Sequence, residues 1–187
     1  MALNVDLHSH STQSDGAIRP AEVARRAHDR GVQWWALSDH DTVAGLAEAA
    51  AAASELGMKF VPGVEISVNF LGASVHILGL HIDPDNTRLQ AGLAGIRSAR
   101  LGRAREIGDR LQACGVGGAF EGALRQAANP SLVGRVHFAR FLVDGGICGT
   151  MQQAFERYLG DGKRACVVMP GTSLEDAVAW IRGATAS

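Results

Sequence analysis

Hydrophobic and polar residues follow two different patterns along this chain, and the change between them divides the sequence. Over the first 85 residues, short apolar runs of strand length alternate with longer stretches of helical periodicity. The predicted strands are residues 3–10, 32–38, 59–62, 65–70 and 75–80, and the predicted helices are residues 20–30 and 43–56. Strands that alternate with helices in this way indicate an α/β fold on a largely parallel sheet.

The pattern becomes purely helical after Asp83. The predicted helices are residues 89–114, 119–127, 132–143 and 151–159. A strand signal returns at residues 165–169, and the spacing of Thr172 and Glu175 predicts a capping box that opens a helix over residues 174–181. We therefore expect three parts: an α/β platform (residues 1–85), a helical insertion (residues 86–162) and a return to the platform (residues 163–187).

Composition excludes several classes of protein. With 187 residues, 47% hydrophobic and 20% charged, the chain is expected to be one globular domain with an insertion. No apolar run reaches the length of a membrane span, and the N-terminus has no signal-peptide pattern. The three cysteines have no CxxC spacing and are predicted to be reduced thiols. We expect a cytoplasmic protein with no membrane partner.

Charge is distributed unevenly between the two halves. Residues 1–85 carry 11 Asp and Glu against 5 Lys and Arg, together with six of the seven histidines. Residues 86–187 carry 8 acidic residues against 13 basic ones. An acidic, histidine-rich half favours cation binding, and an arginine-rich half favours an anionic ligand, although most of the 16 arginines are expected on solvated helix faces.

Possible metal ligands stand at or near the ends of four predicted strands. These residues are His8, His10, Asp15, His40, Glu65 and His76. His8 and His10 lie two residues apart on a strand, so their side chains project to one face. Glu65 lies in an apolar strand, where an unpaired charge would cost several kcal/mol, so it must meet a cation, a donor or solvent.

Each of these residues also has an ordinary structural interpretation. Strand histidines are often exposed or packed in a core, and an aspartate such as Asp41 commonly caps a helix. Four strand ends that all carry His, Asp or Glu are harder to attribute to chance, since parallel strands bring their carboxyl ends to one edge. Nitrogen and oxygen donors without thiolate suit Mn, Zn or Fe, and a carboxylate can bridge two ions. Because clusters of such ions hydrolyse phosphate esters, a phosphate-ester hydrolase is the leading hypothesis.

Three segments resemble the first motifs of the polymerase and histidinol phosphatase (PHP) family. They are Asp-Leu-His-Ser-His-Ser at residues 6–11, Ser-Asp-His-Asp-Thr at residues 38–42 and Gly-Val-Glu-Ile-Ser at residues 63–67. The resemblance implies a distorted (β/α) barrel with two or three divalent metal ions (Mn, Zn or Fe) at the carboxyl ends of its strands. It also implies that His8 and His10 bind a first metal and that Asp15 and His40 bind a second. Glu65 would then bridge the first metal and a third, which His76 also binds.

The helical insertion resembles the cap of the family's small nucleotide phosphatases. That resemblance implies that two segments contact the substrate, through Gly102, Arg103, Arg105, Gly134, Arg135 and His137. It suggests His137 as a proton donor to the leaving group or as a phosphate ligand. On a helix, Arg100 and Arg103 share a face and could bind a second phosphate, although surface ion pairs explain any single arginine equally well.

Several substrates are compatible with these features. Within the family, the chain most resembles the branch that removes the 3′-phosphate of nucleoside 3′,5′-bisphosphates such as adenosine 3′,5′-bisphosphate, giving AMP. The alternatives are a histidinol phosphatase, a 5′-3′ exonuclease acting on short RNA or DNA ends, and a noncatalytic metal-binding fragment. The arginine-rich insertion favours a ligand with more than one phosphate. Aromatic residues make up only 5% of the chain, so no stable nucleic-acid partner is expected.

The sequence departs from the family pattern at its C-terminal end. Family members continue with a strand that ends in Ala-His-Pro and with a later Ser-Asp-x-His motif, which supply further metal ligands. This sequence ends at Ser187, before either motif. We therefore expect an incomplete barrel that lacks its C-terminal strands, and we expect these 187 residues alone to bind metal weakly and hydrolyse little.

Overall fold

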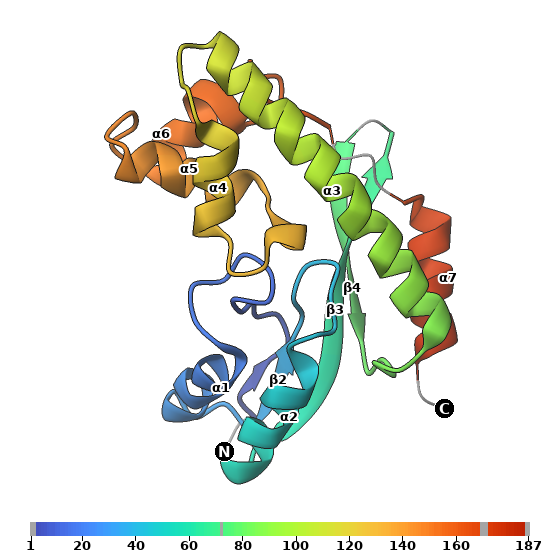
Figure 1. The fold of residues 1–187 in the computed structure, drawn as a ribbon. Helices are drawn as coiled ribbons and strands as arrows, with labels where there is room; N and C mark the ends of the chain where they lie inside the picture. Colours follow the sequence, from blue (N-terminus) through green and yellow to red (C-terminus); the bar gives the residue numbers. More distant parts are fainter. Residues whose placement is uncertain (1–2, 72, 169–171, 186–187) are drawn as a thin grey trace.

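An α/β platform and a helical lobe are joined by one long helix in the computed structural model, which describes residues 3–71, 73–168 and 172–185 (Figure 1). The elements of the platform are β1 (Val5–Asp6), α1 (Pro20–Asp29), β2 (Trp34–Leu37), α2 (Leu46–Glu55), β3 (Lys59–Phe70) and β4 (Ala73–Leu80). They are followed by α3 (Thr87–Ala113), α4 (Ala119–Gln126), the 3-10 helix η1 (Pro130–Leu132), α5 (Arg135–Asp144), α6 (Met151–Ala154), the π-helical turn η2 (Phe155–Leu159) and α7 (Leu174–Ala184).

The described strands form one sheet in the order β1-β2-β3-β4. The first three are parallel, and β4 returns antiparallel to β3. Trp35 and Leu37 of β2 are completely buried, and α2 presents Ala49 and Ala53 to the same core. Small side chains on this face let the helix approach the sheet closely. The expected α/β platform is therefore confirmed for the described residues.

Two strands differ from the prediction. The first strand covers two residues rather than residues 3–10, although the Ser38 amide after β2 still donates to the Ser9 carbonyl at 2.9 Å. The third and fourth predicted strands are one continuous strand, β3. A Cβ atom on Gly63 would lie 3.0 Å from the carbonyl oxygen of Leu37, so this glycine permits close approach of β2 and does not end the strand.

Helix α3 links two hydrophobic cores. Leu89 and Leu93 near its start pack into the platform core, whereas Ile107 and Leu111 near its end pack into the core of the helical lobe. The first turns of α3 therefore pack with the platform, although the hydrophobic pattern of the sequence already becomes helical before residue 86. Figure 1 shows α3 running from beside α7 to the top of the helical lobe.

Several boundaries after α3 also differ from the prediction. Residues 165–168 form no strand, and Met169 lies outside the described residues. The N-cap of α7 is Ser173 rather than Thr172, since the Ser173 hydroxyl accepts a hydrogen bond from the Asp176 amide at 3.0 Å. Thr172 instead pairs with Val68 of β3 in an isolated parallel bridge.

Other predicted elements agree in type but shift at their ends. Helix α2 begins at Leu46 instead of residue 43, and α5 begins at Arg135 after the short turn η1. The predicted helix at residues 151–159 is divided between α6 and η2. All three cysteines are free thiols, and none of the described helices has the length and apolarity to cross a bilayer.

The contact between α3 and α7 gives a first prediction. A Cβ atom on Gly92 would lie 2.6 Å from the Trp180 ring, whereas one on Gly95 of the same helix would meet nothing within 4 Å. The gain in helix propensity from glycine to alanine is the same at both positions, so the difference in stability between the two variants reports the contact with Trp180. Because overpacking costs about 1–3 kcal/mol, we expect Gly92→Ala to be less stable than Gly95→Ala by that amount in urea unfolding. Equal stability of the two variants would contradict the described packing.

Candidate metal centre

Neighbouring strands bring His40 and His76 to Glu65. The segment after β2 runs on beside β3, with the Asp41 amide donating to the Glu65 carbonyl at 2.9 Å and an isolated bridge between His40 and Glu65. On β4, His76 stands two residues from Leu78, the partner of Glu65 in the β3–β4 register. Residues two apart on a strand share a face, so His76 projects beside Glu65.

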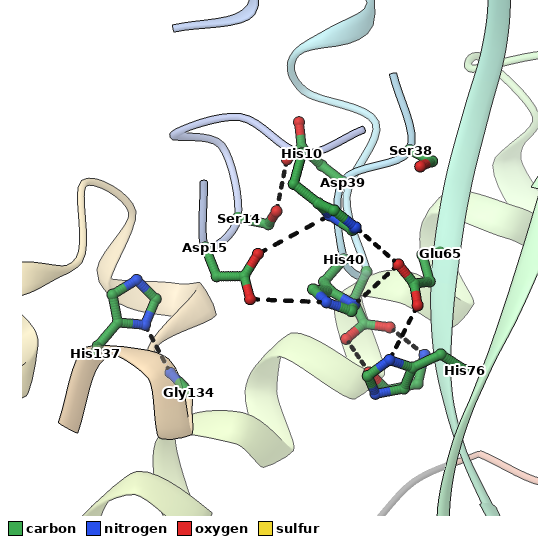
Figure 2. Close-up of polar contacts among 12 residues, drawn as sticks. His10, Ser14, Asp15, Ser38, Asp39, His40, Glu65, His76, Gly134 and His137 are labelled. Atoms are coloured by element: carbon green, nitrogen blue, oxygen red, sulfur yellow. Dashed lines mark hydrogen bonds and ion pairs between the residues drawn. The ribbon is translucent and has the colours of Figure 1, made fainter. Parts of the chain in front are cut away.

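Glu65 is the centre of the cluster. One carboxylate oxygen lies 2.7 Å from His8 Nε2 and 3.0 Å from His10 Nε2, and the other lies 3.0 Å from His76 Nδ1. Burial alone would raise the pKa of Glu65, but hydrogen bonds with His10, His76 and His8 and the nearby His40 hold it well below its usual range. The Glu65 carboxylate is therefore ionised at neutral pH. Figure 2 shows it between His10, His40 and His76.

Asp15 reaches the cluster from a folded-back loop. Its two oxygens lie 3.9 Å from His10 Nδ1 and 3.8 Å from His40 Nε2. The loop folds tightly because a Cβ atom on Gly16 would lie 2.7 Å from the His10 carbonyl oxygen, so only glycine fits there. Figure 2 shows Asp15 facing His10 and His40 across the site.

Asp39 holds this loop from beneath. Its carboxylate is almost completely buried and accepts hydrogen bonds from the Ser11 amide at 2.7 Å, the Ser11 hydroxyl at 2.6 Å and the Ser14 hydroxyl at 2.5 Å. Asp39 is one residue before His40, so it ties the two ligand-bearing loops together. Its oxygens are used by the two serines, and Asp39 belongs to none of the groups of candidate ligands.

The six predicted ligands form three overlapping groups. The groups are His8, His10 and Glu65; His10, Asp15 and His40; and His40, Glu65 and His76. Within each group, one possible ligand atom per residue lies within 4.8 Å of the others. Glu65 belongs to the first and third groups, as the resemblance to PHP proteins implied for a bridging carboxylate. His10 and His40 are also shared between groups.

The donor atoms fit a divalent cation. The Nδ1 atoms of His10 and His40 are buried and have no hydrogen-bond partner among the described residues. A buried polar atom without a partner costs about 1–3 kcal/mol, so both positions favour a ligand that can bind the lone pair. Burial lowers the pKa of His40 to about 4, against the opposing effect of Asp15 and Glu65, so this imidazole is neutral at neutral pH. Neutral imidazole is the form that binds metal.

A cavity of about 120 Å³ opens beside the cluster, between the platform and the helical lobe. Its lining includes Asp15, His40, Ser67 and His76 from the platform and Arg100, Arg103, Gly134 and Arg135 from the insertion. The structure thus brings Arg103, Gly134 and Arg135 beside the proposed ligands. Gly102 is exposed, and the guanidinium of Arg105 lies over the Phe120 ring at 4.9 Å. Neither residue lines this cavity, and the substrate contact that the resemblance implied for Gly102 and Arg105 stays a prediction.

The arginines of the cavity have different surroundings. Arg100 is buried and donates to Asp41 through both Nε and Nη2. Arg103 donates through Nε to the Val167 carbonyl at 2.8 Å, and Arg135 donates to Asp161 at 2.9 Å. Burial and the neighbouring Arg135 and Arg100 lower the pKa of Arg103 to about 10, so it remains charged at neutral pH. Because Arg103 and Arg135 both line the cavity, their positive charge favours an anionic ligand in it.

His137 does not line this cavity. It is buried, and its Nδ1 accepts a hydrogen bond from the Gly134 amide at 3.0 Å (Figure 2). Burial and the nearby Arg140 lower the pKa of His137, so the imidazole is neutral at neutral pH. A neutral imidazole that supports the start of α5 is poorly suited to donate a proton to a leaving group, and we do not assign it that role.

Two of the polar residues that support the site were not expected from sequence. Asp41 was interpreted as a helix cap, but its carboxylate is buried against Ser67 and Arg100. Arg140 of α5 donates to the Asp15 carbonyl at 2.7 Å, which links the helical lobe to the ligand loop. No local pattern marks either contact, since the partners are far apart in sequence.

Comparison with known proteins agrees with this geometry. Residues 6–114, more than half of the chain, match the family model described as the PHP domain. The chain belongs to the PHP family. The curved sheet of the platform and the helices around it are those of a PHP-type (β/α) barrel, of which the described strands form an open portion.

Individual PHP relatives cover nearly the whole chain. It is 51% identical to a 3′,5′-nucleoside bisphosphate phosphatase of Chromobacterium violaceum over 97% of its length, and 43% identical to a 5′-3′ exoribonuclease of Haemophilus influenzae over 98%. It spans 64% and 66% of these relatives, less than two thirds in both cases. A crystal structure from Bifidobacterium adolescentis, described as a metal-dependent phosphoesterase, superposes with a TM-score of 0.89 at 30% identity, covering 98% of this chain and 65% of that one.

Proposed function

We propose that this PHP-family protein is a metal-dependent phosphomonoesterase. The observation that carries the proposal is a single cavity with His40, His76 and Asp15 on one wall and Arg103 and Arg135 on the other. Such a cavity suits a phosphate ester, because a phosphoryl group can meet cations on both sides. The names of the relatives, a bisphosphate phosphatase and an exoribonuclease, support hydrolysis of phosphate esters as the reaction class.

We assign the metal ligands to His8, His10, Asp15, His40, Glu65 and His76, which would hold two or three divalent ions such as Mn, Zn or Fe. When bound, such ions polarise the phosphoryl group and lower the pKa of bound water. The protein's own residues prepare the site. Glu65 stays ionised, His40 stays neutral, and Asp39 fixes the loop of Asp15.

The substrate we propose is a nucleoside 3′,5′-bisphosphate. One phosphate would lie at the metal ligands, and Arg103 and Arg135 would bind the other. The relative named as a 3′,5′-nucleoside bisphosphate phosphatase supports this choice. Histidinol phosphate has a single phosphate, so with that phosphate at the metal ligands neither Arg103 nor Arg135 would have an anion to bind. The relative named as a 5′-3′ exoribonuclease supports the 5′ ends of short RNA as the second candidate substrate.

Comparing substrates with the purified protein and Mn²⁺ tests this proposal. We expect kcat/KM for adenosine 3′,5′-bisphosphate to exceed that for AMP by at least about tenfold, since hydrogen bonds to charged groups contribute about 1.5–3 kcal/mol. Arg103→Ala should remove most of that preference. Faster hydrolysis of 5′-phosphorylated RNA trinucleotides would favour the exonuclease alternative. Bound metal without turnover of any of these substrates would favour a noncatalytic module.

Metal affinity should fall in acid. Burial would lower the pKa of His10, but its hydrogen bond with Glu65 and the charge of Asp15 raise it above its ordinary value. A protonated imidazole cannot bind metal, so protons compete with the ion as the pH falls through the raised pKa of His10. Calorimetric titration with Mn²⁺ should show progressively weaker binding from pH 8 to pH 6. Affinity that is independent of pH in this range would remove His10 from the ligand set.

A further inference from the structure

Asp41 has an unusual backbone conformation next to the proposed ligand His40. Its φ angle is 51°, in the left-handed region that residues other than glycine seldom adopt. A conformation of this kind persists only where surrounding contacts hold it. His40 itself supplies no such restraint through Nδ1, which has no hydrogen-bond partner among the described residues.

The restraint on this segment comes from β3 and α3. The Asp41 carboxylate, completely buried, accepts from the Ser67 amide at 2.7 Å, from the Ser67 hydroxyl at 2.9 Å and from Arg100 Nε at 2.8 Å. Arg100 Nη2 also donates to this carboxylate and to the Ser67 hydroxyl. In the backbone, the Asp41 carbonyl accepts from Arg97 Nη1 at 2.8 Å. Arg97 and Arg100 lie one turn apart on α3, so they approach the segment from the same side.

We propose that Arg100 is a positioning residue for the metal centre: through Asp41 it holds His40 beside Glu65. The buried pair also joins α3, the helix that carries the cavity arginine Arg103, to the strand that carries Glu65. Partners that orient a metal ligand commonly change metal affinity by about ten- to a hundredfold when they are removed. The inference rests on the proposed metal centre but not on the identity of the substrate.

Arg103 provides a matched comparison on the same helix. It lines the same cavity one turn after Arg100 but donates to the Val167 carbonyl, and among the described residues no hydrogen bond or ion pair joins it to His40 or Asp41. If Arg100 acts on the metal ligands, its removal should affect metal binding. If it acts as a phosphate ligand, its removal should resemble that of Arg103. The two roles therefore predict opposite results for Mn²⁺ and for phosphate.

The test measures the dissociation constants of Mn²⁺ and of inorganic phosphate by calorimetry for Arg100→Gln, Arg100→Lys and Arg103→Gln in the full-length protein. We expect Arg100→Gln to weaken Mn²⁺ binding at least about tenfold. Excess Mn²⁺ should then restore kcat with KM unchanged. Arg103→Gln should bind Mn²⁺ like the wild type but bind phosphate more weakly. Lysine cannot reproduce the two-nitrogen contact, so Arg100→Lys should also lose Mn²⁺ affinity.

Thermal unfolding of the metal-free variants shows whether each is folded. If Arg100→Gln is unfolded, the Mn²⁺ affinity of Arg100→Lys decides the outcome. Wild-type Mn²⁺ affinity in a folded Arg100 variant would overturn the proposal. So would a loss of phosphate binding alone, as expected for Arg103→Gln, or a wild-type protein that binds no Mn²⁺. A wild type that binds Mn²⁺ but hydrolyses no phosphate ester would contradict the proposed function. The metal affinities of the variants would then still decide whether Arg100 is a positioning residue.

Discussion

Replacement of Glu65 by glutamine in the full-length protein is expected to abolish Mn²⁺ binding and to lower kcat/KM for phosphate-ester hydrolysis by at least about a thousandfold. Glu65 lies within hydrogen-bond distance of three histidines and belongs to two of the three ligand groups. Glutamine has the shape of glutamate but lacks the negative charge that would offset two cations. Metal content after dialysis and steady-state kinetics with Mn²⁺ provide the measurement.

His28 provides the control for this variant. It is an exposed histidine of α1 outside all three groups, so His28→Ala should keep wild-type metal content and activity. A Glu65→Gln protein that keeps both its metal and its turnover would show that the cluster around Glu65 is a hydrogen-bonded network without a metal.

Replacement of Asp39 by alanine is expected to have the largest effect on stability, about 3–5 kcal/mol of the free energy of unfolding. Three hydrogen bonds to one buried carboxylate would be lost, and the buried Ser11 and Ser14 would be left without their acceptor. The loop that carries Asp15 would also lose its support, so Mn²⁺ affinity should fall together with stability.

Urea unfolding of the metal-free protein and calorimetry with Mn²⁺ measure both effects. Asp39→Asn keeps one acceptor oxygen and should lose less stability, while Asp29→Ala, at an exposed residue of α1, should change it by less than about 0.5 kcal/mol. A loss below about 1 kcal/mol for Asp39→Ala would mean that the loop of Asp15 is held by other contacts.

That the six candidate ligands lie together could be predicted from sequence, because a parallel sheet makes its strand ends converge. An HxH pair after one strand, Asp-His-Asp after the next and a carboxylate within the third are local signals, and the α/β pattern brings them to one edge. The order of elements was predicted for the same reason, since strands and helices have different periods. The pattern therefore predicts the edge of the sheet at which the candidate ligands lie.

The contacts that support the ligands could not be predicted in this way. Asp41 and Arg100 are 59 residues apart, and Asp41 has the local signature of a helix cap. The resemblance placed Arg103 and Arg105 together, but two residues along a helix turn a side chain to another face, and only Arg103 lines the cavity. Residues 59–62 and 65–70 were predicted as separate strands, but Gly63 pairs with Leu80 of β4 and the strand continues through it.

Anomalous diffraction from crystals of the protein grown with Mn²⁺ tests the central claim most directly. We expect two or three peaks within the cluster, each about 2.0–2.3 Å from the nitrogen and oxygen donors of one of the three groups, with Glu65 next to two of them. A map without peaks at saturating Mn²⁺, in which His8, His10 and His76 bond only to Glu65 and water, would contradict it.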